Sequence, residues 1–219
     1  MADMRLSAIA IDDLRDLFSG NADAGQRLRQ LASAAFPPAP PAPRRGVLHK
    51  LGGPLLRRAA DAPVVRPGVP TGNDLNDLLA GRDVPGDRLS AVWTLVQLWL
   101  ADRAWGQLDL AITEDRLNDL DFELATRGVP AEFALRKVFN GRLSVPVKAL
   151  PGQVTGYVRN VHARQMALSW EPVVATLSSG NAETARQIVD WLGGFERWTD
   201  LAVDGGRRPP DLVSTLLVG

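Results

Sequence analysis

The sequence predicts an α+β protein that is predominantly α-helical, with a helical body, a few short strands and a proline-rich basic arm. Apolar residues recur at helical spacing beyond residue 71, and short alternating runs typical of strands separate some of these segments. A stretch rich in proline and arginine interrupts the N-terminal third. Hydrophobic residues make up 45% of the 219, which is enough for a globular core.

The N-terminal segment, residues 1–36, is expected to hold a short strand over residues 5–11 and two helices. Asp12 is expected to cap the first helix, over residues 13–18, and Asn21 the second. Short polar side chains at these positions accept hydrogen bonds from the free N–H groups of a first helical turn.

Residues 37–70 form the linker or arm. Residues 37–43 contain five prolines, which lack the amide donor and favour an extended polyproline helix. The stretch that follows, residues 44–66, holds six cations against the single carboxylate of Asp61; these are Arg44, Arg45, Lys50, Arg57, Arg58 and Arg66.

Residues 71–219 are expected to form a helical main domain. Thr71 or Asn73 can cap its first helix. A second helix, from residue 89, carries a wide apolar face and is expected to be the structural centre; the face comprises Leu89, Val92, Trp93, Val96, Trp99 and Leu100. Its apolar run is interrupted by Ser90, Thr94 and Gln97 and is far shorter than the roughly 20 residues of a membrane span.

The pattern in the middle of this domain predicts a strand followed by two helices. The strand alternates Leu108, Leu110 and Ile112, and Thr113 can cap the helix that follows. Pro130 is placed to start the next helix. Two short edge strands are expected after it, over residues 145–147 and 154–158.

The last third of the chain is expected to be helical again. Residues 161–177 form one element that Pro172 kinks or divides. Residues 182–201 carry a firm amphipathic pattern in spite of two adjacent glycines. Residues 211–218 are expected to close the chain as a helix or a strand.

Composition excludes several kinds of chemistry. The chain has no cysteine, which excludes disulfides, thiolate zinc sites, iron–sulfur clusters and cysteine nucleophiles. No glycine-rich phosphate loop or nucleophile elbow occurs, and His49 and His162 lack neighbours at metal-ligand spacing. The sequence therefore favours a protein without catalytic residues, cofactor or metal.

Charge is distributed unevenly although 25 basic residues balance 25 acidic ones. Residues 71–126 hold eleven carboxylates against four arginines, opposite in sign to the arm. We therefore expect a non-enzymatic accessory protein that binds a basic protein partner through an acidic face. The expected contact residues are Asp109, Asp115, Asp119 and Asp121, with Trp105 and Trp170 as anchors if their side chains are exposed.

Three other interpretations stay open. The basic arm can dock on the acidic part of its own chain, or it can bind nucleic acid through its six cations. Asp115, Asp119 and Asp121 can instead hold a divalent metal in an enzyme. The N-terminus shows no apolar signal-peptide core, so the expected location is cytoplasmic, without a membrane partner. The sequence leaves the oligomeric state open.

Residues 70–219 resemble uncharacterised actinobacterial proteins grouped only as domains of unknown function. The similarity is carried by the order of five features. These are Leu117-x-x-Leu-Asp with Gly128-Val129-Pro130, Val145-Pro146-Val147, Gly156-Tyr157-Val158, the helix of Phe195 and Trp198, and the closing Asp211-Leu212-Val213. The resemblance implies, by association, an immunity-like or accessory role, and the Pro/Arg stretch departs from its pattern.

Overall fold

The computed structural model describes residues 2–37 and 66–218. Its strands form one antiparallel sheet in the order β2-β1-β4-β3. The strands are β1 (Ala2–Ile9), β2 (Gln107–Ala111), β3 (Gln153–Val158) and β4 (Asp211–Val218). The α-helices are α1 (Ile11–Asp16), α2 (Ala22–Ala35), α3 (Gly72–Leu79), α4 (Leu89–Arg103), α5 (Glu114–Thr126), α6 (Asn160–Trp170), α7 (Ser179–Leu192) and α8 (Gly194–Asp204).

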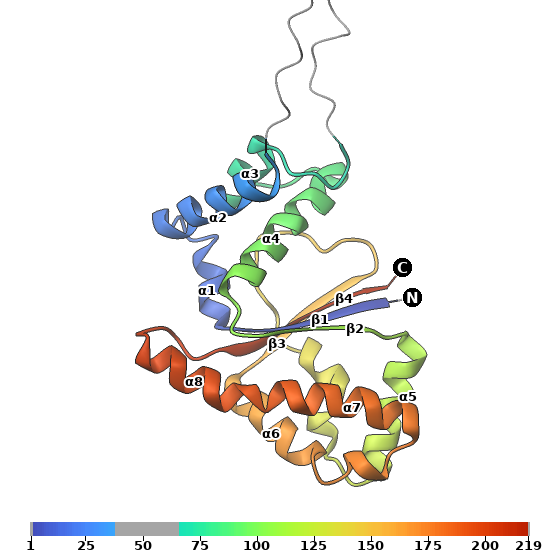
Figure 1. The fold of residues 1–219 in the computed structure, drawn as a ribbon. Helices are drawn as coiled ribbons and strands as arrows, with labels where there is room; N and C mark the ends of the chain where they lie inside the picture. Colours follow the sequence, from blue (N-terminus) through green and yellow to red (C-terminus); the bar gives the residue numbers. More distant parts are fainter. Residues whose placement is uncertain (1, 38–65, 219) are drawn as a thin grey trace, which may run out of the picture.

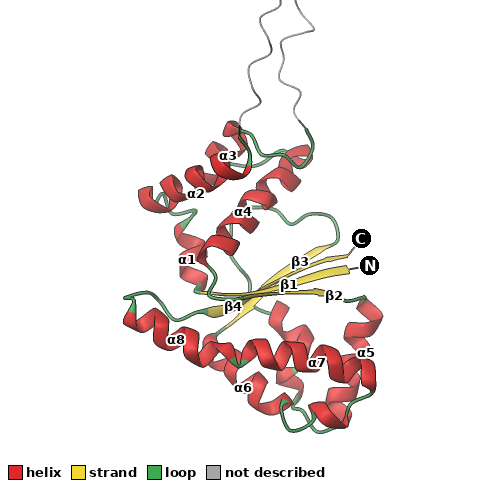
Figure 2. Cartoon of the chain, in the orientation of Figure 1, coloured by secondary structure: helices red, strands yellow, loops and turns green. Residues whose placement is uncertain are grey.

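The sheet separates two helical layers (Figure 1). Helices α1 to α4 cover one face, and α5 to α8 cover the other. Helix is the main secondary structure, as the colouring of Figure 2 makes plain. The predicted class, α+β and predominantly α-helical, is confirmed.

Alternation along the strands supplies both cores, because successive side chains of a strand point to opposite faces. In β1, Met4, Leu6 and Ala8 pack with the layer of α5 to α8, whereas Ile9 packs with the layer of α1 to α4. Val213 of β4 joins the same core as Ile9.

The two ends of the described chain pair with each other at the centre of the sheet. β1 runs antiparallel to β4, with Ala2 opposite Val218. The alternatives for residues 211–218 are thereby decided in favour of a strand, which is buried on both faces from Asp211 to Leu216. The N-terminal segment shares this sheet with residues 71–218.

Several predicted helix caps are confirmed. The Asn21 side chain accepts from the N–H groups of Asp23 and Ala24, and Thr71 forms a reciprocal capping box with Asp74. The Thr113 side chain accepts from the N–H of Arg116. The cap assigned to Asp12 is wrong: α1 starts earlier, Asp12 lies in its first turn, and its N-cap residue is Ala10.

Other predicted elements differ from the structure. The helix expected after Pro130 consists of two 3₁₀ segments, Ala131–Phe133 and Leu135–Phe139, which share Ala134 as an extended junction residue. Residues 145–147 form no strand, whereas residues 153–158 form β3 at the sheet edge. By contrast, the element expected over 161–177, kinked or divided by Pro172, is divided as predicted: α6 ends at Trp170, and the 3₁₀ segment Val174–Thr176 follows Pro172, whose ring lacks the amide donor.

The predicted helix over residues 182–201 is divided into α7 and α8. The division falls at Gly193 and Gly194, which have the lowest helix propensity after proline. A Cβ atom at Gly194 would lie 2.5 Å from the Trp198 indole, so glycine is required for this ring to pack there.

No helix among residues 2–37 and 66–218 combines the length and the apolar character needed to cross a membrane. The prolines at positions 38–43 and most of the basic arm lie outside the described residues.

Candidate functional site

The eleven carboxylates of residues 71–126 do not form one acidic face. Six of them make ion pairs, four with basic residues outside this stretch and two, Asp74 and Asp77, with arginines inside it; the six are Asp74, Asp77, Asp83, Asp102, Asp109 and Glu114. Two more, Asp121 and Glu123, accept hydrogen bonds from neighbouring elements. The side chains of the remaining three form neither an ion pair nor a hydrogen bond with another described residue; these are Asp87, Asp115 and Asp119.

Helix α5 presents two of these three carboxylates outward. The side chains of Leu117, Leu120 and Leu124 recur at helical spacing and are buried against the layer below the sheet. The opposite side of the helix carries Asp115, Asp119 and Phe122, at the spacing i, i+4 and i+7. We call these three residues the α5 outer face.

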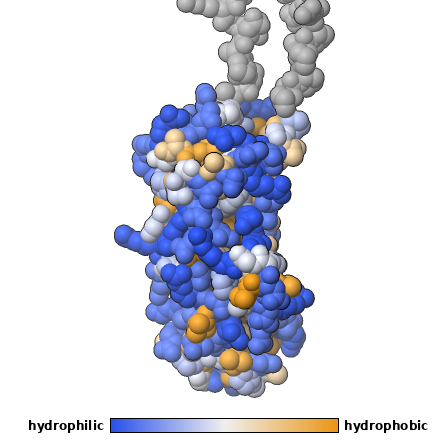
Figure 3. Space-filling model, turned by 90° about the vertical axis from the view of Figure 1, so that its left-hand side faces the viewer, coloured by the Kyte–Doolittle hydropathy of each residue, from blue (hydrophilic) through white to orange (hydrophobic). Residues whose placement is uncertain are grey.

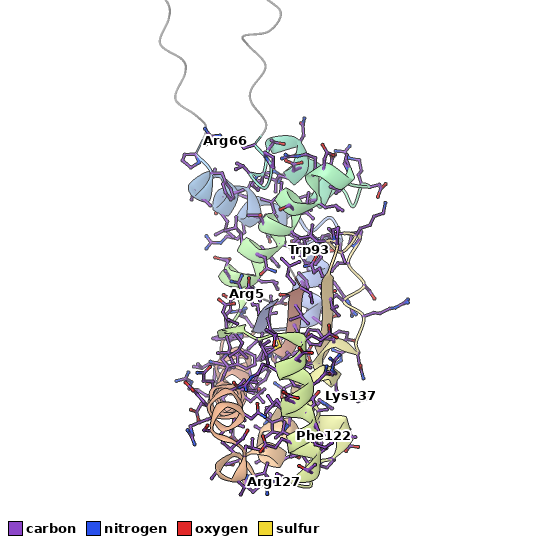
Figure 4. The ribbon with its side chains drawn as sticks, turned by 90° about the vertical axis from the view of Figure 1, so that its right-hand side faces the viewer. Arg5, Arg66, Trp93, Phe122, Arg127 and Lys137 are labelled. Carbon is purple, nitrogen blue, oxygen red and sulfur yellow. The ribbon has the colours of Figure 1, made fainter. Side chains whose placement is uncertain are left out.

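Phe122 is the most exposed large apolar side chain in the described part of the chain, at 72% exposure. Figure 4 shows it on the surface of α5, with Arg127 at the C-terminal end of the helix. Phe122 is not among the contact residues expected from the sequence. The available signal was its position two residues from Leu120 and two from Leu124, which places an aromatic ring off the buried stripe.

Asp121 turns toward the 3₁₀ segment Leu135–Phe139 rather than toward solvent. Its two carboxylate oxygens accept hydrogen bonds from the backbone N–H groups of Leu135 and Arg136. Burial raises the pKa of Asp121, and these hydrogen bonds oppose the shift only in part. The prediction that Asp121 contacts a partner is therefore replaced by a structural role in holding this segment.

Glu123 turns to the other side and holds the start of α7. It accepts hydrogen bonds from the Asn181 amide at 2.7 Å, the Ser178 hydroxyl at 2.8 Å and the Ser178 N–H at 2.6 Å. The bonds from Asn181 and then Ser178 lower the pKa of Glu123. Three consecutive residues, Asp121, Phe122 and Glu123, thus point to three different surroundings, and only Phe122 is left for a partner.

Asp109 lies on β2 and is paired with Arg5 of the neighbouring strand. The Arg5 guanidinium donates to both oxygens of Asp109, at 2.5 and 3.1 Å, and also to the Gln97 side chain at 2.9 Å. The Asp109 side chain remains 63% exposed. It projects from the sheet face that α4 covers, apart from the α5 outer face.

The two tryptophans proposed as anchors do not meet the condition of exposure. Trp170 is fully buried at 0% exposure, and its indole N–H donates to the Phe133 carbonyl at 2.9 Å. Trp105 is partly buried, and the Arg207 guanidinium lies 4.5 Å from its ring centroid. Neither indole is available as an anchor, because core packing or an arginine covers it.

The metal interpretation of Asp115, Asp119 and Asp121 is not supported by their placement. Asp121 faces the 3₁₀ segment while the other two face outward, since a helix separates residues one or two positions apart. Across the described residues, no group of three or more His, Asp or Glu side chains is placed to hold a metal ion. His162 packs on Phe133, with ring centroids 5.2 Å apart.

Most of the predicted basic arm lies outside the described residues. This applies to Arg44, Arg45, Lys50, Arg57 and Arg58. Arg66 is described and exposed, and Figure 4 shows it where the chain enters the layer of α1 to α4.

Comparison of the chain with models of protein families, with curated proteins and with solved structures found no match.

Proposed function

We propose that this is a non-enzymatic protein-binding protein that docks a basic partner on the α5 outer face. The observation that carries this proposal is the exposure of Phe122 beside Asp119 and Asp115, whose carboxylates are not paired with a described residue. Aromatic residues, phenylalanine among them, are enriched in the cores of protein interfaces relative to the rest of the surface.

Burial of the Phe122 ring would supply most of the affinity. Transfer of a phenylalanine side chain from water to an apolar pocket stabilises a complex by roughly 1.5–3 kcal/mol. The other strongly exposed apolar residues in the layer of α5 to α8 are aliphatic, such as Leu168 of α6 at 70% exposure. On the side of the molecule seen in Figure 3, apolar residues form separate small patches in a largely hydrophilic surface.

The carboxylates would orient the partner rather than hold it. Asp115 and Asp119 lie on the N-terminal side of Phe122, and Arg127 lies at the C-terminal end of the helix. A complementary partner therefore has an apolar pocket with basic residues on one side of it. Exposed ion pairs contribute about 0–1 kcal/mol each, but they accelerate association at low salt. A basic toxin bound by an immunity-like factor would be one partner of this chemistry.

The test is site-specific photo-crosslinking in the native host. A photoreactive amino acid replaces Phe122 in the full chain, and a matched variant carries it at Leu168, which is equally exposed on another helix. Proteins crosslinked only from position 122 are identified, purified and titrated against the unlabelled chain. Phe122→Ala is expected to weaken binding at least tenfold, about 1.4 kcal/mol, while Leu168→Ala leaves it unchanged.

The charge contribution is tested with the same purified partner. The double variant Asp115→Asn with Asp119→Asn is expected to slow association at low salt and to lose its effect at high salt. A partner captured equally from positions 122 and 168, or unaffected by Phe122→Ala, would contradict the proposal. Nucleic-acid binding through residues 44–66 remains a prediction, since no observation on the described residues favours it.

A further inference from the structure

A cleft of about 650 Å³ lies between α4 and the sheet. The C-terminal half of α4 packs near the sheet through Trp99 and Leu100, in the same core as Ile9. Its N-terminal half rises away from the strands, as Figure 1 shows. Residues of both α4 and the strands line the cleft. Its volume falls in the range of small-molecule binding sites.

The floor of the cleft is a row of polar residues across the sheet. The strand register places Asp109, Arg5, Thr215 and Thr155 side by side on one face. The first three line the cleft, and Thr155 continues the row. A sheet face covered by a helix is ordinarily apolar, and this face is apolar at its other end, where Val213 packs under α4. The polar residues therefore lie where α4 leaves the sheet.

The roof of the cleft is polar as well. Ser90, Thr94 and Gln97 recur at the spacing i, i+4 and i+7 along α4, and all three line the cleft. These are the residues that interrupt the apolar run of this helix in the sequence. The Gln97 carbonyl oxygen accepts from Arg5 at 2.9 Å, so the side-chain amide N–H groups are the donors left for a ligand.

The charges of the lining select against anions. The guanidinium of Arg5 is neutralised by the Asp109 carboxylate, which accepts two of its hydrogen bonds. Asp3 adds a further negative charge, so the ionised side chains of the lining sum to a negative value. An anionic ligand would have to compete with Asp109 for Arg5 in this field.

Leu150 and Leu217 give the cleft an apolar wall, and Trp93, which is buried at 3% exposure, borders it. The Trp93 indole N–H donates to the Lys148 carbonyl at 2.8 Å, which fixes the ring orientation. Figure 4 shows Trp93 above Arg5, on the same side of the molecule. The cleft thus combines an apolar wall with adjacent hydrogen-bond donors, acceptors and hydroxyls.

From this juxtaposition we infer a ligand site for a small uncharged polyhydroxylated ring, of the monosaccharide or cyclitol class. A hydroxyl group both donates and accepts, so one ring can bond to Asp109, Thr215 and the Gln97 amide together. Asp109 and Thr215 lie on β2 and β4 with β1 between them, so they are two strand spacings, about 10 Å, apart, and hydroxyls on opposite sides of the ring reach the two groups. The C–H groups of the ring pack on the apolar part of the lining, such as Leu217, which is 40% exposed. This site lies on the opposite side of the sheet from the α5 outer face and does not depend on it.

The test is titration of the full chain with defined probes, followed by calorimetry and by amide NMR shifts. The uncharged probes are glucose, ribose and myo-inositol, and the anionic probes are inorganic phosphate and glucose 6-phosphate. At least one uncharged probe is expected to bind saturably with a Kd in the millimolar range or below, and more tightly than either anion. Its NMR shifts are expected to concentrate on β1, β2, β4 and α4.

Variants assign the binding to the cleft. We expect Gln97→Leu and Thr215→Val each to lower the affinity of the protein for the bound probe at least tenfold. Thr184→Val, a matched change on α7 outside the cleft lining, leaves the affinity unchanged. Thermal unfolding without probe confirms that each variant is folded. The inference would be overturned by any of three results: no uncharged probe binds at about 50 mM, an anionic probe binds more tightly, or Gln97→Leu keeps the full affinity for the probe.

Discussion

The carboxylate of Asp211 accepts a hydrogen bond from the backbone N–H of Ile11, 3.1 Å away and 200 positions earlier in the chain. Its other oxygen accepts from the backbone N–H of Asn160, also at 3.1 Å. Ile11 begins α1 on one face of the sheet and Asn160 begins α6 on the other. One buried carboxylate at the start of β4 therefore caps two helices in opposite layers.

Removal of this carboxylate is expected to destabilise both layers at once. A helix cap contributes about 1 kcal/mol and up to about 2, so Asp211→Ala should lower the free energy of unfolding by roughly 2–4 kcal/mol. Urea unfolding followed by far-UV circular dichroism measures the change. Asp200→Ala, an exposed change on α8, is the control and should stay within about 0.5 kcal/mol. Equal effects of the two variants would contradict this role of Asp211.

The contrast between Trp170 and Phe122 gives a second prediction. Trp170→Ala leaves a large cavity and an unpaired Phe133 carbonyl in the lower core, with an expected cost of about 3–5 kcal/mol. Phe122→Ala removes a side chain that is 72% exposed and should change the free energy of unfolding by less than about 0.5 kcal/mol. Thermal unfolding of both variants decides the matter, and a large loss with Phe122→Ala would place that ring in the core.

Gly156 of β3 offers a test of close packing between the sheet and the 3₁₀ segment. A Cβ atom there would lie 2.4 Å from the Cα atom of Phe139, which is backbone and cannot rotate away. Gly156→Ala is therefore expected to cost at least about 1–3 kcal/mol, measured by urea unfolding. Gly72→Ala is the matched control because no atom lies within 4 Å of its Cβ position. It should be neutral or stabilise by up to about 1 kcal/mol.

The hydrogen bonds to Glu123 predict that the free energy of unfolding falls at acidic pH. Its pKa is lower in the folded chain than in the unfolded chain, because Asn181 and Ser178 donate to its ionised form. The stabilisation is therefore complete above the unfolded pKa of about 4.3 and is lost as the pH falls through the folded pKa. Glu123→Gln should flatten the stability profile in this window, measured by urea unfolding between about pH 3 and 6. Glu183→Gln, exposed on α7, should leave the slope unchanged.

Local patterns predicted much of the secondary structure for identifiable reasons. Asn21 and Thr113 were recognised as caps, and Thr71 was one of two candidates beside Asn73, because a cap acts within three residues of its own position. The cap of α1 was misassigned because the acceptor for its first N–H comes from Asp211, far along the chain. The region after Pro130 forms 3₁₀ segments, and Asp121 of α5 accepts from their backbone, which is a tertiary contact invisible in the local pattern.

The candidate surfaces show the same difference between what local sequence patterns predict and what tertiary contacts decide. Charge counting over residues 71–126 found an acidic excess but not its neutralisation, because most of the paired cations come from outside that range, such as Arg5 for Asp109. The expected tryptophan anchors were covered by packing, and the exposed aromatic is Phe122. Ser90, Thr94 and Gln97 were visible as interruptions of an apolar helix, but only the divergence of α4 from the sheet turns them into a cleft lining.

By itself, the sequence determined the class of fold, most helix starts and the absence of cysteine chemistry, since all of these depend on composition or on contacts a few residues apart. The tertiary structure decided the pairing of β1 with β4, the dispersal of the acidic residues, and the row formed by Asp109, Arg5 and Thr215. The strand pairings join residues about a hundred or more positions apart, and four of the six paired carboxylates find their cations outside residues 71–126. Such contacts arise from strand register and layer packing, which no local pattern encodes.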